Sequence, residues 1–164
     1  DADCRMPANM LAEIERALVS GKVVGGGASF RPDRRSPGIL VTTALVKIAV
    51  WCKGLAGVSY WCFRRDFAAL GGCNEKLVMG EDLEFAARLK ELGRHRRQRF
   101  ITLPRAQVTI SMRKFDHFGD WYFLRAMARH GSRDNIEKLM RGECSAELLR
   151  FADDYFYEWD ADKK

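Results

Sequence analysis

Glycine and proline residues divide this sequence into short segments, and the hydrophobic periodicity changes from one segment to the next. Residues 8–20 place apolar side chains at helical spacing behind Pro7 and stop at Gly21, which predicts a helix. Residues 81–92 have the same spacing and are followed by Gly93, which predicts a second helix that ends there. Because such helices alternate with short strands, the pattern indicates an α/β arrangement of layers.

Segments of strand character lie between these helices. Val23 and Val24 predict a strand that breaks at the glycines 25–27 and leads into a basic loop at 31–38. Aromatic and apolar residues at 58–64 predict another strand. The other predicted elements are strands at 100–103 and 108–111 on either side of Pro104, a helix that follows Gly119 and ends at Gly131, and helices near 134–141 and 145–158.

The composition is that of one domain with a basic surface. The chain has 164 residues, 47% of them hydrophobic, and a formal net charge of +6, so some surface should attract anions such as diphosphates, nucleic acid or acidic lipid headgroups. Its five cysteines lack C-x-x-C spacing, which argues against a disulfide framework or thiolate zinc site and favours a cytoplasmic location. No export leader precedes Asp1, and we expect the chain to begin inside a domain.

The longest apolar run, Ile39 to Trp51, predicts a buried or interfacial helix. It contains Lys47 and is shorter than the roughly 20 apolar residues that a membrane-spanning helix needs. Together with the basic surface, this run also suggests peripheral association with the inner face of an anionic membrane.

Two pairs of acidic residues are candidates for chemistry. Asp1 and Asp3 are two positions apart, so at the end of a strand both carboxylates would share a face and could reach one divalent cation; the alternative is a solvated turn. Glu81 and Asp82 follow Gly80 at a predicted helix start. There they either complement the helix dipole or supply a general base, Asp82.

The order of these motifs resembles the second half of the family 2 glycosyltransferases, from Asp1 to about Trp121. The most specific part is residues 67–93. The motifs there occur in the same order as in the family: a Gly-Gly turn, Glu75, the Glu81-Asp82 helix start, Arg88-Leu89 and Gly93. The family commonly places an aromatic residue and an aspartate before the glutamate of this turn. Cys73 and Asn74 stand there instead, which puts the shape of the acceptor pocket in question.

The resemblance implies the α/β GT-A fold (the Rossmann-like fold of nucleotide-diphospho-sugar transferases), truncated at the D-x-D motif. Residues 1–130 would form the metal- and acceptor-side part of that domain, and residues 131–164 a helical C-terminal extension. The activity would be transfer of a sugar, with inversion, from a nucleotide sugar (most simply a UDP-sugar) to a hydroxyl of a lipid-linked or glycan acceptor.

The resemblance also assigns roles to the acidic pairs. Asp3 would bind a Mn²⁺ or Mg²⁺ ion directly, and Asp1 would contact the metal through water or bind the ribose of the donor. Asp82 would deprotonate the acceptor hydroxyl, and Glu81 would help to position the acceptor or the base.

Downstream, Ser111-Met112-Arg113-Lys114-Phe115 resembles the family's Ser-x-Arg-Arg/Lys segment. Arg113 and Lys114 would then place cations against the leaving diphosphate; a solvated basic loop is the alternative. His117 is a candidate metal ligand or part of a helix-start turn.

Two aromatic residues, Trp61 and Trp121, are candidates for a platform on which a sugar stacks, although large aromatics at such spacing also occur in cores. Two other functions stay open. One is a module that binds anions or nucleic acid through the arginine-rich run 94–99, which lacks a recognisable docking motif. The other is a catalytically inactive fragment without the nucleotide-binding half.

Overall fold

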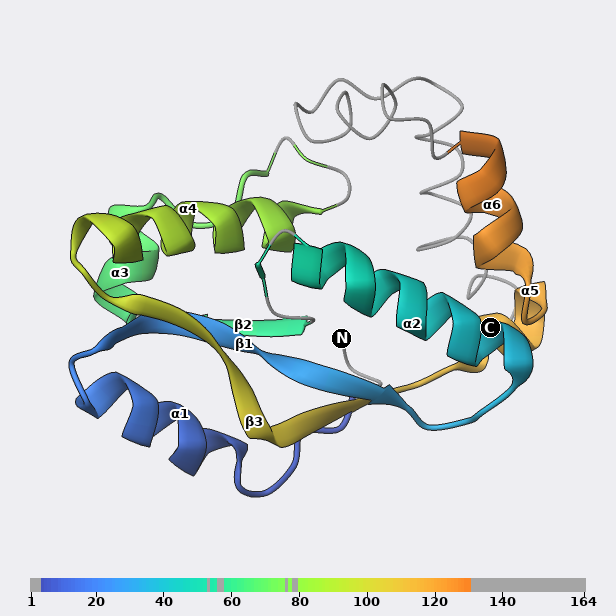
Figure 1. The fold of residues 1–164 in the computed structure, drawn as a ribbon, viewed down its shortest axis with the longest axis horizontal. Helices are drawn as coiled ribbons and strands as arrows, with labels where there is room; N and C mark the ends of the chain where they lie inside the picture. Colours follow the sequence, from blue (N-terminus) through green and yellow to red (C-terminus); the bar gives the residue numbers. More distant parts are fainter. Residues whose placement is uncertain (1–3, 53, 56–57, 76, 78–79, 131–164) are drawn as a thin grey trace.

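The computed structural model describes residues 4–52, 54–55, 58–75, 77 and 80–130. In this part of the chain, helices pack on both faces of a small sheet (Figure 1). The helices are α1 (Met10–Val19), α2 (Pro37–Cys52), α3 (Arg64–Ala69), α4 (Glu81–His95), α5 (Arg113–Phe118) and α6 (Tyr122–His130), and the strands are β1 (Val23–Pro32), β2 (Val58–Cys62) and β3 (Arg99–Ile110).

The structure confirms the α/β class and several predicted elements. Helices are present within 8–20 and 119–131, and a strand is present within 58–64. The predicted helices at 134–141 and 145–158, with the whole extension 131–164, lie outside the described residues.

The sheet is mixed, with the strand order β2-β1-β3. The central strand β1 pairs antiparallel with β2 and parallel with β3. Beyond β3, Arg5 forms one antiparallel bridge to Thr109. The segment that follows the predicted D-x-D motif therefore lies against the C-terminal part of β3.

Two hydrophobic clusters lie on the two faces of the sheet. Val23 packs in one cluster with Met10 and Leu18 of α1, whereas Val24 packs in the other with Phe85 and Leu89 of α4. Successive side chains of a strand point to opposite faces, so these two valines bind β1 to one helix on each side. Figure 1 shows this layering, with α1 below the sheet and α2 and α4 above it.

The prediction that the strand breaks at glycines 25–27 is wrong, because β1 continues through them to Pro32. A Cβ atom at Gly25 would overlap the carbonyl oxygen of Trp61 on β2, and one at Gly26 would overlap that of Ile101 on β3. The glycines therefore allow the neighbouring backbones to approach β1 closely.

The prediction of two short strands around Pro104 is also wrong, because β3 is continuous from Arg99 to Ile110. Ala28 pairs with Leu103, but the next residue of β1, Ser29, pairs with Gln107. Residues 104–106 thus form a bulge, which takes up the proline while pairing resumes beyond it.

Helix α4 does not end at Gly93, as the sequence predicted, but continues to His95. A Cβ atom at Gly93 would lie 2.7 Å from Cγ1 of Val24 and 3.0 Å from the carbonyl oxygen of Gln98. This glycine permits close packing of α4 on β1, and it is not a helix stop.

Helix α2 buries one face and exposes an apolar one. Ile39, Thr42 and Val50 are buried. The exposed large apolar side chains of α2 are Leu40, Val41, Leu45, Ile48 and Trp51. Among the described residues, no helix has both the length and the apolar character to cross a membrane.

Two short helices were not predicted. α5 forms where the basic segment after Ser111 was expected, and α3 follows β2 directly. In α3, Asp66 is 3% exposed and accepts a hydrogen bond of 2.5 Å from Nη1 of Arg96. This ion pair joins α3 to the end of α4.

Candidate functional site

The predicted general base, Asp82, lies in the first turn of α4 beside Glu81. Gly80 precedes them in a left-handed conformation with φ +80°, a region that glycine occupies without strain. Both carboxylates are exposed, and Oδ1 of Asp82 accepts a hydrogen bond of 2.7 Å from the N–H of Leu83. The pair is therefore open to a substrate and attached to the start of a rigid helix.

Arg88, about two turns further along α4, fastens the Gly-Gly turn to this helix. Its Nη1 donates to the carbonyl oxygen of Leu70 at 2.5 Å, and its Nη2 donates to that of Gly72 at 2.8 Å. Nε and Nη2 also donate to the two carboxylate oxygens of Glu84, at 2.6 and 2.7 Å. One planar guanidinium thus holds the turn and the acidic helix start in a fixed relation.

Two further titratable side chains lie near the acidic pair. Burial, and secondarily the Asp82 carboxylate, raise the pKa of Tyr60 on β2. Burial, followed by the charge of Glu81, raises the pKa of the Cys73 thiol in the Gly-Gly turn. A raised pKa favours the protonated thiol, which is a poorer nucleophile than the thiolate.

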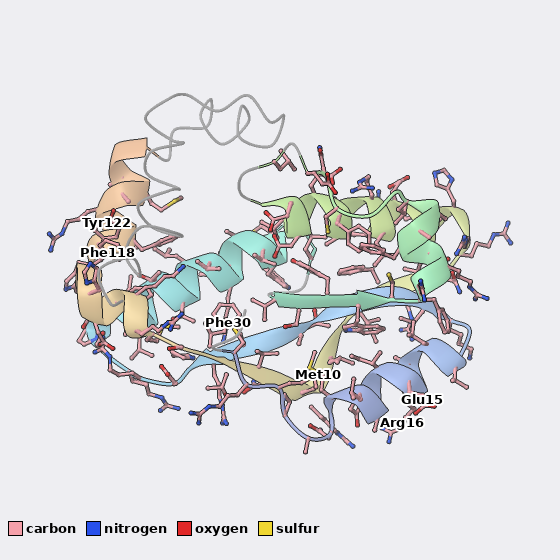
Figure 2. All side chains as sticks on the ribbon, turned by 180° about the vertical axis from the view of Figure 1, so that it is seen from behind. Met10, Glu15, Arg16, Phe30, Phe118 and Tyr122 are labelled. Carbon is pink, nitrogen blue, oxygen red and sulfur yellow. The ribbon has the colours of Figure 1, made fainter. Side chains whose placement is uncertain are left out.

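The second predicted group, Arg113, Lys114 and His117, lies on α5. The ring of His117 meets Phe118 edge-on at 4.7 Å between centroids, and Phe118 stacks on Tyr122 at 4.5 Å. Figure 2 labels Phe118 and Tyr122 side by side where α5 meets α6. This aromatic stack fixes α5 against the helix that follows it.

Arg34 lies in the predicted basic loop before α2. It connects this loop to α5 and to the segment between α5 and α6. It forms ion pairs of 2.8 Å with Asp116 and 2.7 Å with Asp120. Hydrogen bonds from Ser36 and from Arg34 hold the pKa of Asp120 below its usual value. The loop is therefore anchored at this point.

The structure does not bring the two groups together. Figure 1 places α4 and α5 on opposite sides of the molecule, with α2 running between them. Glu81 and Asp82 therefore lie on a different helix from Arg113, Lys114 and His117, with α2 between the two helices.

The metal site cannot be built from the described residues alone. Asp1 and Asp3 lie outside them, and within the described part of the chain no three side chains of His, Cys, Asp or Glu gather into a metal-binding group. Among the described residues, His117 accordingly does not belong to a group of three such side chains.

Of the two aromatic residues predicted as a platform for a sugar, the prediction for Trp61 is wrong. This residue is only 8% exposed and belongs to the core cluster on the α1 side of the sheet, so it offers no face to a sugar. Trp121 is 45% exposed and stays a predicted platform.

Sequence reasoning missed the role of Arg88, although a signal was present. Glu84 and Arg88 are four residues apart on a predicted helix, the spacing of an ion pair on one helix face. This spacing does not show that Arg88 also binds the Gly-Gly turn, which lies 16 to 18 residues earlier in the chain.

Comparisons with protein-family models, with curated proteins and with solved structures found no significant match to this chain. The fold and the site define a mixed α/β protein with an exposed acidic pair at a helix start.

Proposed function

We propose that this chain belongs to a glycosyltransferase that moves a sugar, with inversion, from a UDP-sugar or a related nucleotide sugar to an acceptor hydroxyl. The observation that carries the proposal is the exposed Glu81-Asp82 pair at the start of α4, with the Gly-Gly turn fastened behind it by Arg88. These elements also carry the resemblance to family 2.

In the proposed reaction Asp82 accepts the proton of the acceptor hydroxyl. The acceptor oxygen then forms a bond to the anomeric carbon, and the bond from that carbon to the diphosphate oxygen breaks on the opposite face. Glu81 is a positioning residue beside the base. A divalent ion held by Asp1 and Asp3 would supply charge stabilisation to the leaving diphosphate.

Arg113 and Lys114 are proposed to attract the diphosphate through their charge. Because α4 and α5 lie on opposite sides of the molecule with α2 between them, this role requires the two helices to approach each other when substrate binds.

Binding and turnover are tested with separate variants. Calorimetric titration of Mn²⁺ and UDP into the chain should give saturable binding that Asp3→Ala removes. Asp82→Asn should keep this binding and lose the release of UDP from UDP-sugars, whereas Glu91→Gln, an exposed carboxylate further along α4, should keep both. The proposal is refuted if the wild-type chain neither binds Mn²⁺ and UDP nor releases UDP from UDP-sugars. The alternative of a catalytically inactive fragment then remains.

The alternative of a nucleic-acid module receives less support from the structure. Within the arginine run 94–99, Arg94 forms an ion pair with Glu91 at 3.0 Å and Arg96 forms one with Asp66. Two of its cations are therefore already partnered.

We further propose peripheral membrane association through the exposed apolar face of α2. A bilayer surface would cover Ile48 and the 77% exposed Trp51, an aromatic residue of the kind that favours membrane interfaces. Ile48→Glu with Trp51→Glu should abolish co-sedimentation with phosphatidylserine vesicles at low salt, whereas Val19→Glu, on an exposed apolar residue of α1, should not. Equal binding by all variants contradicts this role.

A further inference from the structure

A hollow of about 500 Å³ lies at the C-terminal ends of β1 and β3, and none of its described lining residues belongs to α4 or α5. Among the residues that the structure describes, its charged lining groups are three arginines and one carboxylate. The lining residues are Arg5, Met6, Pro7, Arg31, Pro32, Asp33, Arg35, Gln107 and Thr109.

The sheet register places two of these arginines on one face. Thr109 pairs with Arg5 on one side and with Arg31 on the other. Residues in register on neighbouring strands direct their side chains to the same face, and adjacent strands are about 4.8 Å apart. Arg5 and Arg31 therefore flank the Thr109 hydroxyl, with their backbones roughly 10 Å apart.

Hydrogen bonds fix this arrangement. The Arg5 N–H donates to the carbonyl oxygen of Thr109 at 2.8 Å, and the Thr109 N–H donates to that of Arg5 at 2.9 Å. Nε of Arg31 donates to Oγ1 of Thr109 at 3.1 Å, which confirms that these two side chains share a face. The terminal nitrogens of Arg31 carry further N–H donors.

The charge of the hollow is poorly compensated. In the described part of the chain, none of Arg5, Arg31 and Arg35 forms an ion pair, whereas Arg34, next to Arg35, pairs with two aspartates. Oδ1 of Asp33 accepts a hydrogen bond of 2.9 Å from the N–H of Met112. This carboxylate is thus attached to the chain after β3, and among the described lining residues three cations face one anion.

We propose that this hollow binds the phosphoryl group of a small phosphorylated molecule. Guanidinium groups donate paired hydrogen bonds to phosphate oxygens, and the Thr109 hydroxyl and the Gln107 amide offer further polar contacts. The volume exceeds that of one phosphate and suits a phosphomonoester or diphosphate that carries an organic part. Among the described residues of the proposed glycosyltransferase site, none of Glu81, Asp82, Arg113, Lys114 and His117 lines the hollow, so the proposal does not depend on the roles given to these residues.

The test is a titration of inorganic pyrophosphate into the chain in EDTA, which removes any contribution of a metal site. Arg5→Gln with Arg31→Gln should weaken binding at least about tenfold, as expected for the loss of charge-assisted hydrogen bonds. The control is Arg64→Gln with Arg99→Gln, which removes the same charge from exposed residues outside the hollow and should change the affinity less than about twofold. Thr109→Val, which keeps the shape of the side chain, should weaken binding severalfold by itself.

A second arm distinguishes a soluble ligand from a lipid headgroup by using phosphatidylcholine vesicles with and without phosphatidic acid. Saturable pyrophosphate binding that is weakened in the Arg5 and Arg31 variant and kept in the control variant supports a soluble ligand. If only binding to phosphatidic acid vesicles depends on these arginines, the phosphoryl group is that of a lipid. Absence of both, or equal losses in the control variant, overturns the site.

Discussion

Replacement of Arg88 by lysine tests how the Gly-Gly turn is held to α4. Lysine keeps the positive charge and the ion pair with Glu84 at four residues' spacing. It lacks the planar fork, so one ammonium group cannot also donate to the carbonyl oxygens of Leu70 and Gly72. The variant therefore isolates the two hydrogen bonds to the turn.

The magnitude follows from these bonds. A hydrogen bond of this kind contributes about 1 kcal/mol net, and Arg88 is partly buried, so the free energy of unfolding should fall by about 2 kcal/mol. For a chain of this length, that corresponds to a decrease of about 5 °C in the melting temperature.

The assays are urea denaturation and amide hydrogen exchange. The N–H groups of Gly71 and Gly72 donate to the carbonyl oxygens of Ala68 and Phe67, each at 3.0 Å, and should exchange faster when Arg88 no longer holds the turn. Any turnover that depends on Asp82 should fall in the same variant, since the turn and the helix start would lose their fixed relation.

The matched control is Arg94→Lys on the same helix. Arg94 makes one exposed ion pair with Glu91, worth about 0.3 kcal/mol after solvent screening. Equal destabilisation by the two lysine variants, or unchanged exchange at Gly71 and Gly72, would refute the fastening role.

Two other predictions concern the sheet. Gly26→Ala should destabilise the chain by about 3 kcal/mol in urea titration, because its Cβ would overlap a backbone oxygen of β3. Tyr60→Phe should flatten the decrease of folding stability with pH above about 10. Because the pKa of Tyr60 is raised in the folded chain, the unfolded chain loses the tyrosine proton first as pH rises. The contribution of Tyr60 to folding stability is therefore complete below the unfolded pKa of 10.0 and is lost as pH rises above it.

Each of these two has its own check. Gly71→Ala, where φ is +76° and no atom lies within 4 Å of the added carbon, should cost only the backbone strain of about 1 kcal/mol. A smaller effect at Gly26 than at Gly71 would contradict the steric argument. Parallel pH profiles for the wild type and Tyr60→Phe would contradict the assignment of the alkaline transition to this residue.

The helices α1, α4 and α6 and the strand β2 were predictable from the sequence because their signals are local. Apolar side chains repeat within each segment at the spacing of the element. Pro7 precedes the start of α1, and Gly80 precedes the start of α4. The acidic pair Glu81-Asp82 was predicted at a helix start for the same reason, and the structure places it there.

Only the tertiary structure decided what depends on a second segment. Gly26 and Gly93 look like breaks in isolation, yet each sits inside an element because a neighbouring backbone or side chain occupies the place of its Cβ. The burial of Trp61, the contact of Arg88 with the Gly-Gly turn, and the alignment of Arg5 with Arg31 across Thr109 also join residues that are far apart in the chain. Sequence periodicity records which face of a segment is apolar, whereas the identity of the partner on that face is set by strand register and packing.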